Sequence, residues 1–195
     1  MIRRPAALTA LVLALTVVQL VVGTFGGLQQ FEGKGFGYRL IAYPVLMLVV
    51  PLVWWWATQR RGPVEDVPWT AFTLIMVPFL IDVTGNTFDL YDTVQHWDNL
   101  NHLVNWAVLC GGLGLLVARL DVRPRWLLVL AITGIGATLA ILWEIGEWWT
   151  FIRRGVELDG AYEDTLADEI LGTTGAFVAA LLVARFTSHS PAHDR

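Results

Sequence analysis

The chain has 195 residues, of which 55% are hydrophobic and 15% charged, against roughly 25% charged residues in soluble domains. This composition indicates an integral membrane protein, and the length allows one compact bundle rather than several domains. The net charge of −4, without a basic stripe, excludes a nucleic-acid partner, and the single cysteine, Cys110, excludes an internal disulfide or a cysteine-based zinc cluster.

Six apolar segments are each long enough to cross a bilayer, which takes about 20 residues of α-helix. We therefore expect an all-α polytopic membrane bundle of about six transmembrane helices. The segments are residues 5–27, 38–58, 69–88, 98–118, 126–151 and 165–186. The first exceeds the roughly 7–15 apolar residues of a signal peptide, so we expect it to stay in the protein. We expect one integral-membrane domain over residues 1–187 and a disordered cytoplasmic tail over residues 188–195.

Lysine and arginine residues predict the orientation of the bundle, because they are enriched in cytoplasmic loops. With six helices and a cytoplasmic N-terminus, nine of the 13 basic residues fall on the cytoplasmic side. Thirteen of the 17 acidic residues fall instead outside, or in the outer half of the membrane. We therefore expect both termini in the cytoplasm and the polar chemistry on the opposite side.

The stretch of residues 82–102 is unusually polar for a connection between two membrane-length segments. Asp82 and Asn86 lie four residues apart at the end of the third segment, and Tyr91 and Asp92 follow. Ionisable groups beside hydrocarbon are costly and usually functional. We expect these four side chains to bind a polar substrate.

Three later segments carry pairs of polar residues at helical spacing. The pairs are Asp98 and His102, Glu144 and Glu147, and Asp164 and Asp168. Residues three or four apart lie on one helix face. Since hydrocarbon cannot solvate such a face, each pair should point into the bundle. Several small residues would let the helices approach closely; they are Gly111, Gly112, Gly114, Gly134, Gly136, Gly172, Gly175 and Ala176.

Facing carboxylates repel one another unless protons, cations or arginines neutralise them. All six paired residues are candidate metal ligands, and this carboxylate-rich set with one histidine suits Mg²⁺ or Mn²⁺ better than Zn²⁺. In an enzyme, His102, Asp98 and Glu144 would be catalytic in a metal-assisted hydrolysis or transfer. Arg153 and Arg154 would bind the anionic group, since a guanidinium matches phosphate. Membrane lipids, as phosphate-bearing headgroups or envelope precursors, are the expected partners.

Other functions stay open at this point. Glu144, Glu147 and Asp82 could form the relay of a proton- or cation-coupled transporter. The polar set could instead be a structural hydrogen-bond network in a non-catalytic scaffold. The two arginines could form salt bridges with acidic neighbours, namely Glu157, Asp159 or Asp164.

Three motifs cover about residues 82–180: DVTGNTFDLYDT followed by WDNLNH, then LWEIGEWW, then YEDTLADEILGTTGAFVAA. They resemble the YjdF-like family of bacterial inner-membrane proteins, whose function is uncharacterised. The chain is more distantly similar to the VanZ-like membrane proteins, which are linked to glycopeptide-antibiotic resistance. The positions that correspond to its pattern would be Asp98, His102, Glu144 or Glu147, Arg153 or Arg154, Asp168, Gly172 and Ala176. Two positions depart from the pattern: Leu171 stands where the family has Asn, and Ala176 stands where it has its last Gly. The resemblance implies a multi-pass protein of the bacterial plasma (inner) membrane with a common polar site.

Overall fold

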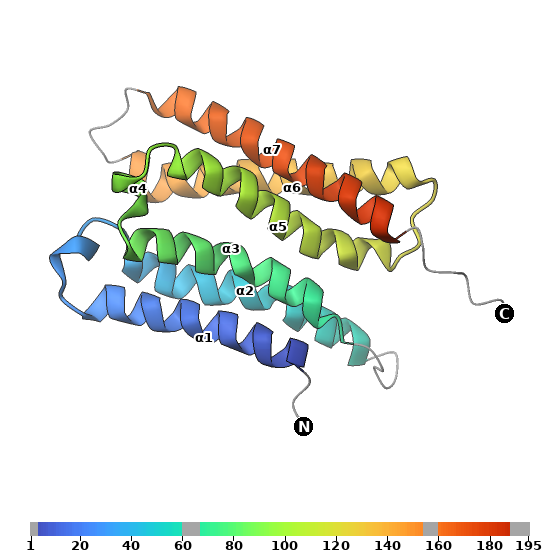
Figure 1. Cartoon of the computed structure of the whole chain (residues 1–195), viewed down its shortest axis with the longest axis horizontal. Helices are drawn as coiled ribbons and strands as arrows, with labels where there is room; N and C mark the ends of the chain where they lie inside the picture. The colour runs from blue at the N-terminus through green and yellow to red at the C-terminus, as the bar shows by residue number, and fades with distance from the viewer. Residues whose placement is uncertain (1–3, 60–66, 154–159, 188–195) are drawn as a thin grey trace. The chain divides into compact units, whose positions relative to one another are not determined.

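The computed structural model describes residues 4–59, 67–153 and 160–187 (Figure 1). Within these ranges the chain is helical and has no β-strand. Six of the described helices are long and apolar enough to cross a membrane, which confirms the predicted class and number. They are α1 (Arg4–Phe25), α2 (Phe36–Gln59), α3 (Trp69–Thr87), α5 (Trp97–Ala118), α6 (Arg125–Glu147) and α7 (Ala161–Phe186).

Three short helical elements lie beside the long helices. They are the 3₁₀ turn η1 (Gln29–Phe31), the helix α4 (Leu90–Thr93) and the π-helical turn η2 (Trp148–Ile152). The sequence did not predict them, because a single turn leaves no hydrophobic period to detect.

Helix α7 begins four residues before the predicted start of the last segment. Gly160, in a left-handed conformation at φ 93°, precedes it, and the Asp164 N–H bonds to the Gly160 carbonyl at 3.0 Å. Glu163 and Asp164 lie in the first turn, where acidic side chains interact favourably with the helix dipole. Hydropathy alone missed this turn because it is polar.

The chain divides into two compact units, Met1–Trp97 and Asp98–Arg195, which we call the N-terminal unit and the C-terminal unit. The N-terminal unit contains α1 to α4, and the C-terminal unit contains α5, α6, η2 and α7. A single domain over residues 1–187 stays a prediction, and the predicted tail over residues 188–195 lies outside the described residues.

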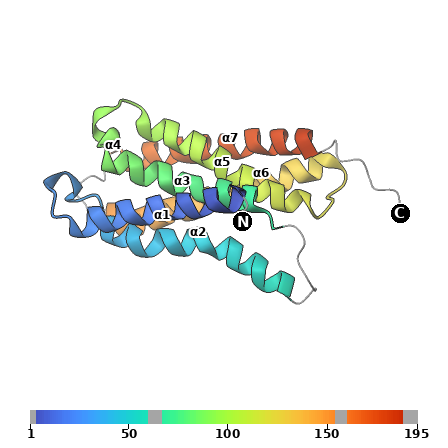
Figure 2. The ribbon, with the colours of Figure 1, turned by 60° about the horizontal axis from the view of Figure 1, so that its bottom comes forward.

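In the N-terminal unit α1 packs against both α2 and α3 (Figure 2). The Thr9 and Thr73 hydroxyl oxygens are 2.7 Å apart, and Gln19 Nε2 donates to Thr84 Oγ1 at 3.2 Å. Hydrogen bonds between membrane helices contribute on the order of 1 kcal/mol each. Helix α1 is thus part of the packed N-terminal unit.

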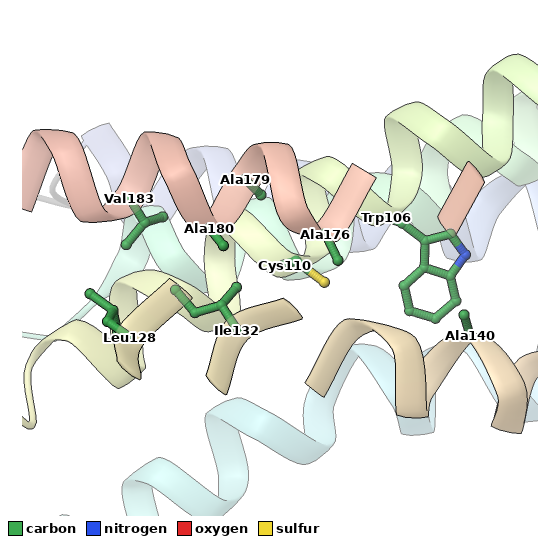
Figure 3. Packing of buried hydrophobic residues seen from close by; sticks show 9 residues of the cluster. All are labelled: Trp106, Cys110, Leu128, Ile132, Ala140, Ala176, Ala179, Ala180 and Val183. Carbon is green, nitrogen blue, oxygen red and sulfur yellow. The ribbon is translucent and has the colours of Figure 1, made fainter. Parts of the chain in front are cut away.

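The core of the C-terminal unit is formed by Trp106 and by small or branched apolar side chains from all three of its long helices (Figure 3). The buried residues are Trp106 and Cys110 from α5, Leu128, Ile132 and Ala140 from α6, and Ala176, Ala179, Ala180 and Val183 from α7. Cys110 is a fully buried free thiol, as the apolar sequence around it predicts.

Glycines set the distance between these helices at some of the predicted positions. A Cβ atom on Gly136 would lie 2.2 Å from Ala176 Cβ and 2.8 Å from Cys110 Sγ, and one on Gly175 would lie 2.3 Å from the Leu103 carbonyl oxygen. Gly114 and Gly172 are crowded in the same way, whereas Gly111 and Gly134 have no such atom within 4 Å. The packing role therefore holds for the first four glycines and not for the last two.

Substitution of Gly136 by alanine tests this packing. Gly136→Ala should destabilise the C-terminal unit by about 1–3 kcal/mol, because the methyl group overlaps Ala176. Gly134→Ala, two residues away on α6, is the matched control and should keep or slightly raise stability, since alanine favours helix. Thermal unfolding in detergent measures both, and equal melting temperatures would contradict the packing role.

Candidate functional site

Polar side chains from all three long helices of the C-terminal unit meet where α5 begins, α6 ends and α7 begins. Asp98 and His102 lie in the first turns of α5, Glu144 and Glu147 lie at the end of α6, and Asp168 lies early in α7. The alternating direction of successive membrane helices brings these three ends to one side of the unit. We call these five residues the acidic cluster.

His102 lies between two carboxylates of the acidic cluster. Its Nε2 is 3.8 Å from Asp98 Oδ1, and its Nδ1 is 3.7 Å from Asp168 Oδ1. These separations exceed a hydrogen-bond length of about 2.7–3.2 Å. They are shorter than twice a metal–ligand bond of about 2.1 Å, so each pair, taken separately and through its own ring nitrogen, has the spacing of two groups that share a cation.

A second group of candidate ligands contains the same histidine. One ligand atom each from His102, Glu144 and Glu147 lies within 4.8 Å of the others, and the same holds for Asp98, His102 and Asp168. The two groups overlap at the imidazole and together form one continuous set of oxygen and nitrogen donors. The cluster thus brings together five of the six predicted metal ligands.

Two acids of the cluster are buried without a lysine or arginine partner among the described residues. Glu144 is 8% exposed and Asp168 is 4% exposed. Within the described part of the chain, neither forms an ion pair with lysine or arginine. Ionised carboxylates repel one another strongly in a poorly polar environment. The arrangement therefore favours a bound cation or retained protons, and four carboxylates with one imidazole suit Mg²⁺ or Mn²⁺.

The remaining predicted residues of this region lie elsewhere. Asp164, the sixth predicted ligand, is exposed on the first turn of α7 and belongs to neither group. Arg153 follows the π-helical turn, with Cζ 3.4 Å from the centroid of the Trp149 ring. Arg154, Glu157 and Asp159 lie outside the described residues.

The N-terminal unit has a separate polar network around Asp82. Its carboxylate accepts hydrogen bonds from the Tyr43 hydroxyl and, at 2.6 Å, from the Tyr91 hydroxyl. Arg39 Nε lies 3.3 Å from the same carboxylate. Asn86 Nδ2 donates to the backbone carbonyl of Asp82 at 3.0 Å. Three of the predicted substrate-binding residues thus pair with groups of their own unit.

The fourth, Asp92, forms an ion pair with Lys34 at 3.3 Å, and Lys34 also bonds to Asp89. Burial lowers the pKa of Lys34, but hydrogen bonds and charges from the two aspartates outweigh it and raise this pKa above its usual value. The hydrogen bond from Lys34 lowers the pKa of the Asp89 carboxyl. These contacts tie the connection before α2 to the connection after α3.

A family of known sequences matches a part of the chain that includes both the acidic cluster and the Asp82 network. The model of a family described as "Predicted membrane protein (DUF2238)" matches residues 8–189. The chain belongs to this family. The resemblance to YjdF-like proteins is consistent with the DUF2238 family, and membership agrees with a multi-pass membrane protein. No curated protein and no solved structure matches the chain.

Sequence reasoning missed three residues of this DUF2238 protein that hold the Asp82 network and the adjoining connections. The distribution of basic residues places Lys34 and Arg39 on the outer side without indicating their partners, and Tyr43 lies within an apolar segment. One signal was available, because Arg39 and Tyr43 are four residues apart at the start of an apolar segment. A charge in such a position requires a partner.

Removal of one partner of the Arg39–Asp82 pair should strongly destabilise the N-terminal unit. Asp82→Ala should lower the free energy of unfolding by about 3–5 kcal/mol, because Arg39 stays buried without its carboxylate. Adding Arg39→Met should recover part of this loss. Chemical unfolding of wild type, both single variants and the double variant measures the coupling, and simple additivity of the two losses would contradict a coupled pair.

The Lys34–Asp89 pair predicts a pH effect. The pKa of Asp89 is lower in the folded protein than its ordinary value of 3.8, so the ionised Asp89 carboxylate stabilises the fold fully above pH 3.8. This stabilisation is lost as the pH falls through the lower pKa of the folded protein. The melting temperature of wild type should exceed that of Asp89→Asn at about pH 5, and the difference should shrink below pH 4. A difference that does not change with pH would contradict this.

Proposed function

We propose that this DUF2238-family protein binds a divalent cation, Mg²⁺ or Mn²⁺, in the acidic cluster and acts on a phosphate-bearing lipid or envelope precursor by hydrolysis or transfer. The observation that carries the proposal is the overlap of two ligand groups at His102, with Glu144 and Asp168 buried beside it. A bound cation would polarise a phosphoryl oxygen or activate water for attack.

The cluster residues differ in exposure, and this suggests different roles. The Asp168 side chain is 6% exposed and that of His102 is 10% exposed, whereas that of Asp98 is 40% exposed. A buried carboxylate that faces one imidazole nitrogen is suited to hold a cation with it. Asp98, which faces the other nitrogen, is accessible to a substrate and can orient the ring or accept a proton. Glu144 and Glu147 complete the donor set from α6.

The position of the cluster along the helices favours a substrate at the membrane surface. It lies where α5 begins and α6 ends, and Trp148 and Trp149 are exposed beside it. Tryptophan is enriched at the level of lipid headgroups. With both termini in the cytoplasm, as the basic residues favour, this end faces the outer side of the bacterial inner membrane. The VanZ-like similarity supports the same residues as a common polar site.

A proton- or cation-coupled transporter is the alternative function. It would need polar groups that continue from the cluster toward the other membrane side. Beyond the cluster, the buried core of α5, α6 and α7 consists of apolar side chains such as Cys110, Ile132 and Ala180 (Figure 3). This apolar core counts against a polar path across the membrane and favours a site that is reached from one side of the membrane. A non-catalytic scaffold, the third alternative, would bind no cation in the acidic cluster.

Cation binding by the purified protein tests the proposal. We expect wild type in detergent to bind Mn²⁺ stoichiometrically, as measured by isothermal titration calorimetry and metal analysis. The variant Glu144→Gln/Asp168→Asn should lose at least roughly 10–100-fold in affinity, because even outer-sphere changes have effects of that size.

The matched control is Glu163→Gln/Asp164→Asn, which removes the same charge from exposed positions of α7. It should bind Mn²⁺ as wild type does. Wild type without bound metal, or equal affinity in both double variants, would contradict the metal site. Phosphate release from phosphatidic acid, present in wild type and absent from Glu144→Gln/Asp168→Asn, would support hydrolysis.

A further inference from the structure

The end of α6 changes its winding directly after the acidic cluster. Following Glu147, the residues Trp148–Ile152 form a π-helical turn, and the Arg153 N–H donates to the Trp148 carbonyl at 2.9 Å. Single π-helical turns are rare and occur often at functional sites.

Trp149 and Arg153 lie four residues apart across this turn, the spacing at which side chains share one helix face. The Arg153 guanidinium lies over the Trp149 ring, with Cζ 3.4 Å from the centroid.

Stacking on Trp149 covers one face of the Arg153 guanidinium. Arg153 Nε is buried, and among the described residues it has no hydrogen-bond partner. The described residues also give Arg153 no carboxylate partner. The five N–H donors of arginine lie in the plane of the group, so a stacked guanidinium presents them as a planar fork. Such a fork matches two oxygens of a phosphate.

We infer that Trp149 is a positioning residue that holds Arg153 as a binding fork for the phosphate ester of a membrane lipid headgroup. Trp149 is 58% exposed and Trp148 is 48% exposed, as expected for side chains at headgroup level. The inference deepens the proposed function and rests on it for the link to catalysis. Phosphate binding itself needs no cation, so the two proposals can fail separately.

The test is lipid binding to the full-length protein in detergent with EDTA, followed by native mass spectrometry. The probes are phosphatidic acid and diacylglycerol with the same acyl chains, which differ only in the phosphate. Wild type should bind phosphatidic acid in preference. Trp149→Ala should weaken this binding at least about 3-fold, the size of a stacking contribution at an exposed site. Trp149→Phe, which keeps a ring, should restore most of it.

Variants of the arginine separate charge from geometry. Arg153→Gln should abolish the preference for phosphatidic acid, and Arg153→Lys should weaken binding although it keeps the charge, because lysine cannot offer a planar fork. Trp126→Ala is the matched control, since Trp126 is 62% exposed at the other end of α6. It should bind as wild type does. Melting temperatures of all variants show that each is folded.

Three results would overturn the inference. Equal binding of phosphatidic acid and diacylglycerol by wild type would exclude a phosphate site. Loss in Arg153→Gln with no change in Trp149→Ala would remove the positioning role of Trp149. Displacement of the lipid by glycerol phosphate at equal concentration would show that a soluble phosphate ester is the ligand. Unchanged lipid binding in Glu144→Gln/Asp168→Asn would show that the site is independent of the metal ligands.

Discussion

A carboxylate buried among membrane helices requires compensation, because neither lipid nor an apolar core can solvate its charge. The chain meets this requirement in two ways. In the N-terminal unit, Asp82 receives hydrogen bonds from two tyrosines and lies next to Arg39. In the C-terminal unit, Glu144 and Asp168 are buried more deeply than Asp82, yet the described residues offer them no arginine or lysine. The same constraint is therefore met by an internally balanced network in one unit, whereas the acidic cluster of the other unit has carboxylates and one imidazole but no lysine or arginine among the described residues.

Close helix packing is what directs the second set of acids inward. Gly136 and Gly175 allow the backbones of α5, α6 and α7 to approach until a methyl group at either position would overlap a neighbour. Contacts this close allow little rotation of one helix against the next, since protein interiors are packed to crystal density. Once rotation is fixed by the apolar core, Glu144 and Asp168 on the polar ends point toward the other helices of the unit, whereas Asp164, one turn before Asp168, stays exposed.

Hydropathy predicted all six long helices, since a membrane span leaves a signal about 20 residues long. The i, i+3 and i, i+4 spacings also predicted which acids would converge, and five of six candidate ligands lie in one cluster. The pairing of Arg39 with Asp82 was missed, because partners on different helices depend on rotation and tilt that no local pattern encodes. The π-helical turn was missed for a related reason: the sequence WWTFI is equally compatible with α-helical winding.

The contrast between Asp82 and Asp168 shows what three-dimensional structure adds to a list of polar residues. Both are aspartates in apolar segments, and both lie one helical turn from another polar residue. Their chemistry differs because the neighbouring helix supplies Arg39 and Tyr43 in one case and a histidine with further carboxylates in the other. A balanced carboxylate gains little from binding a cation, whereas a group of carboxylates without lysine or arginine beside them gains more. This difference in charge balance is why the proposed function is placed at the acidic cluster, and why the Asp82 network is interpreted as internal support of its own unit.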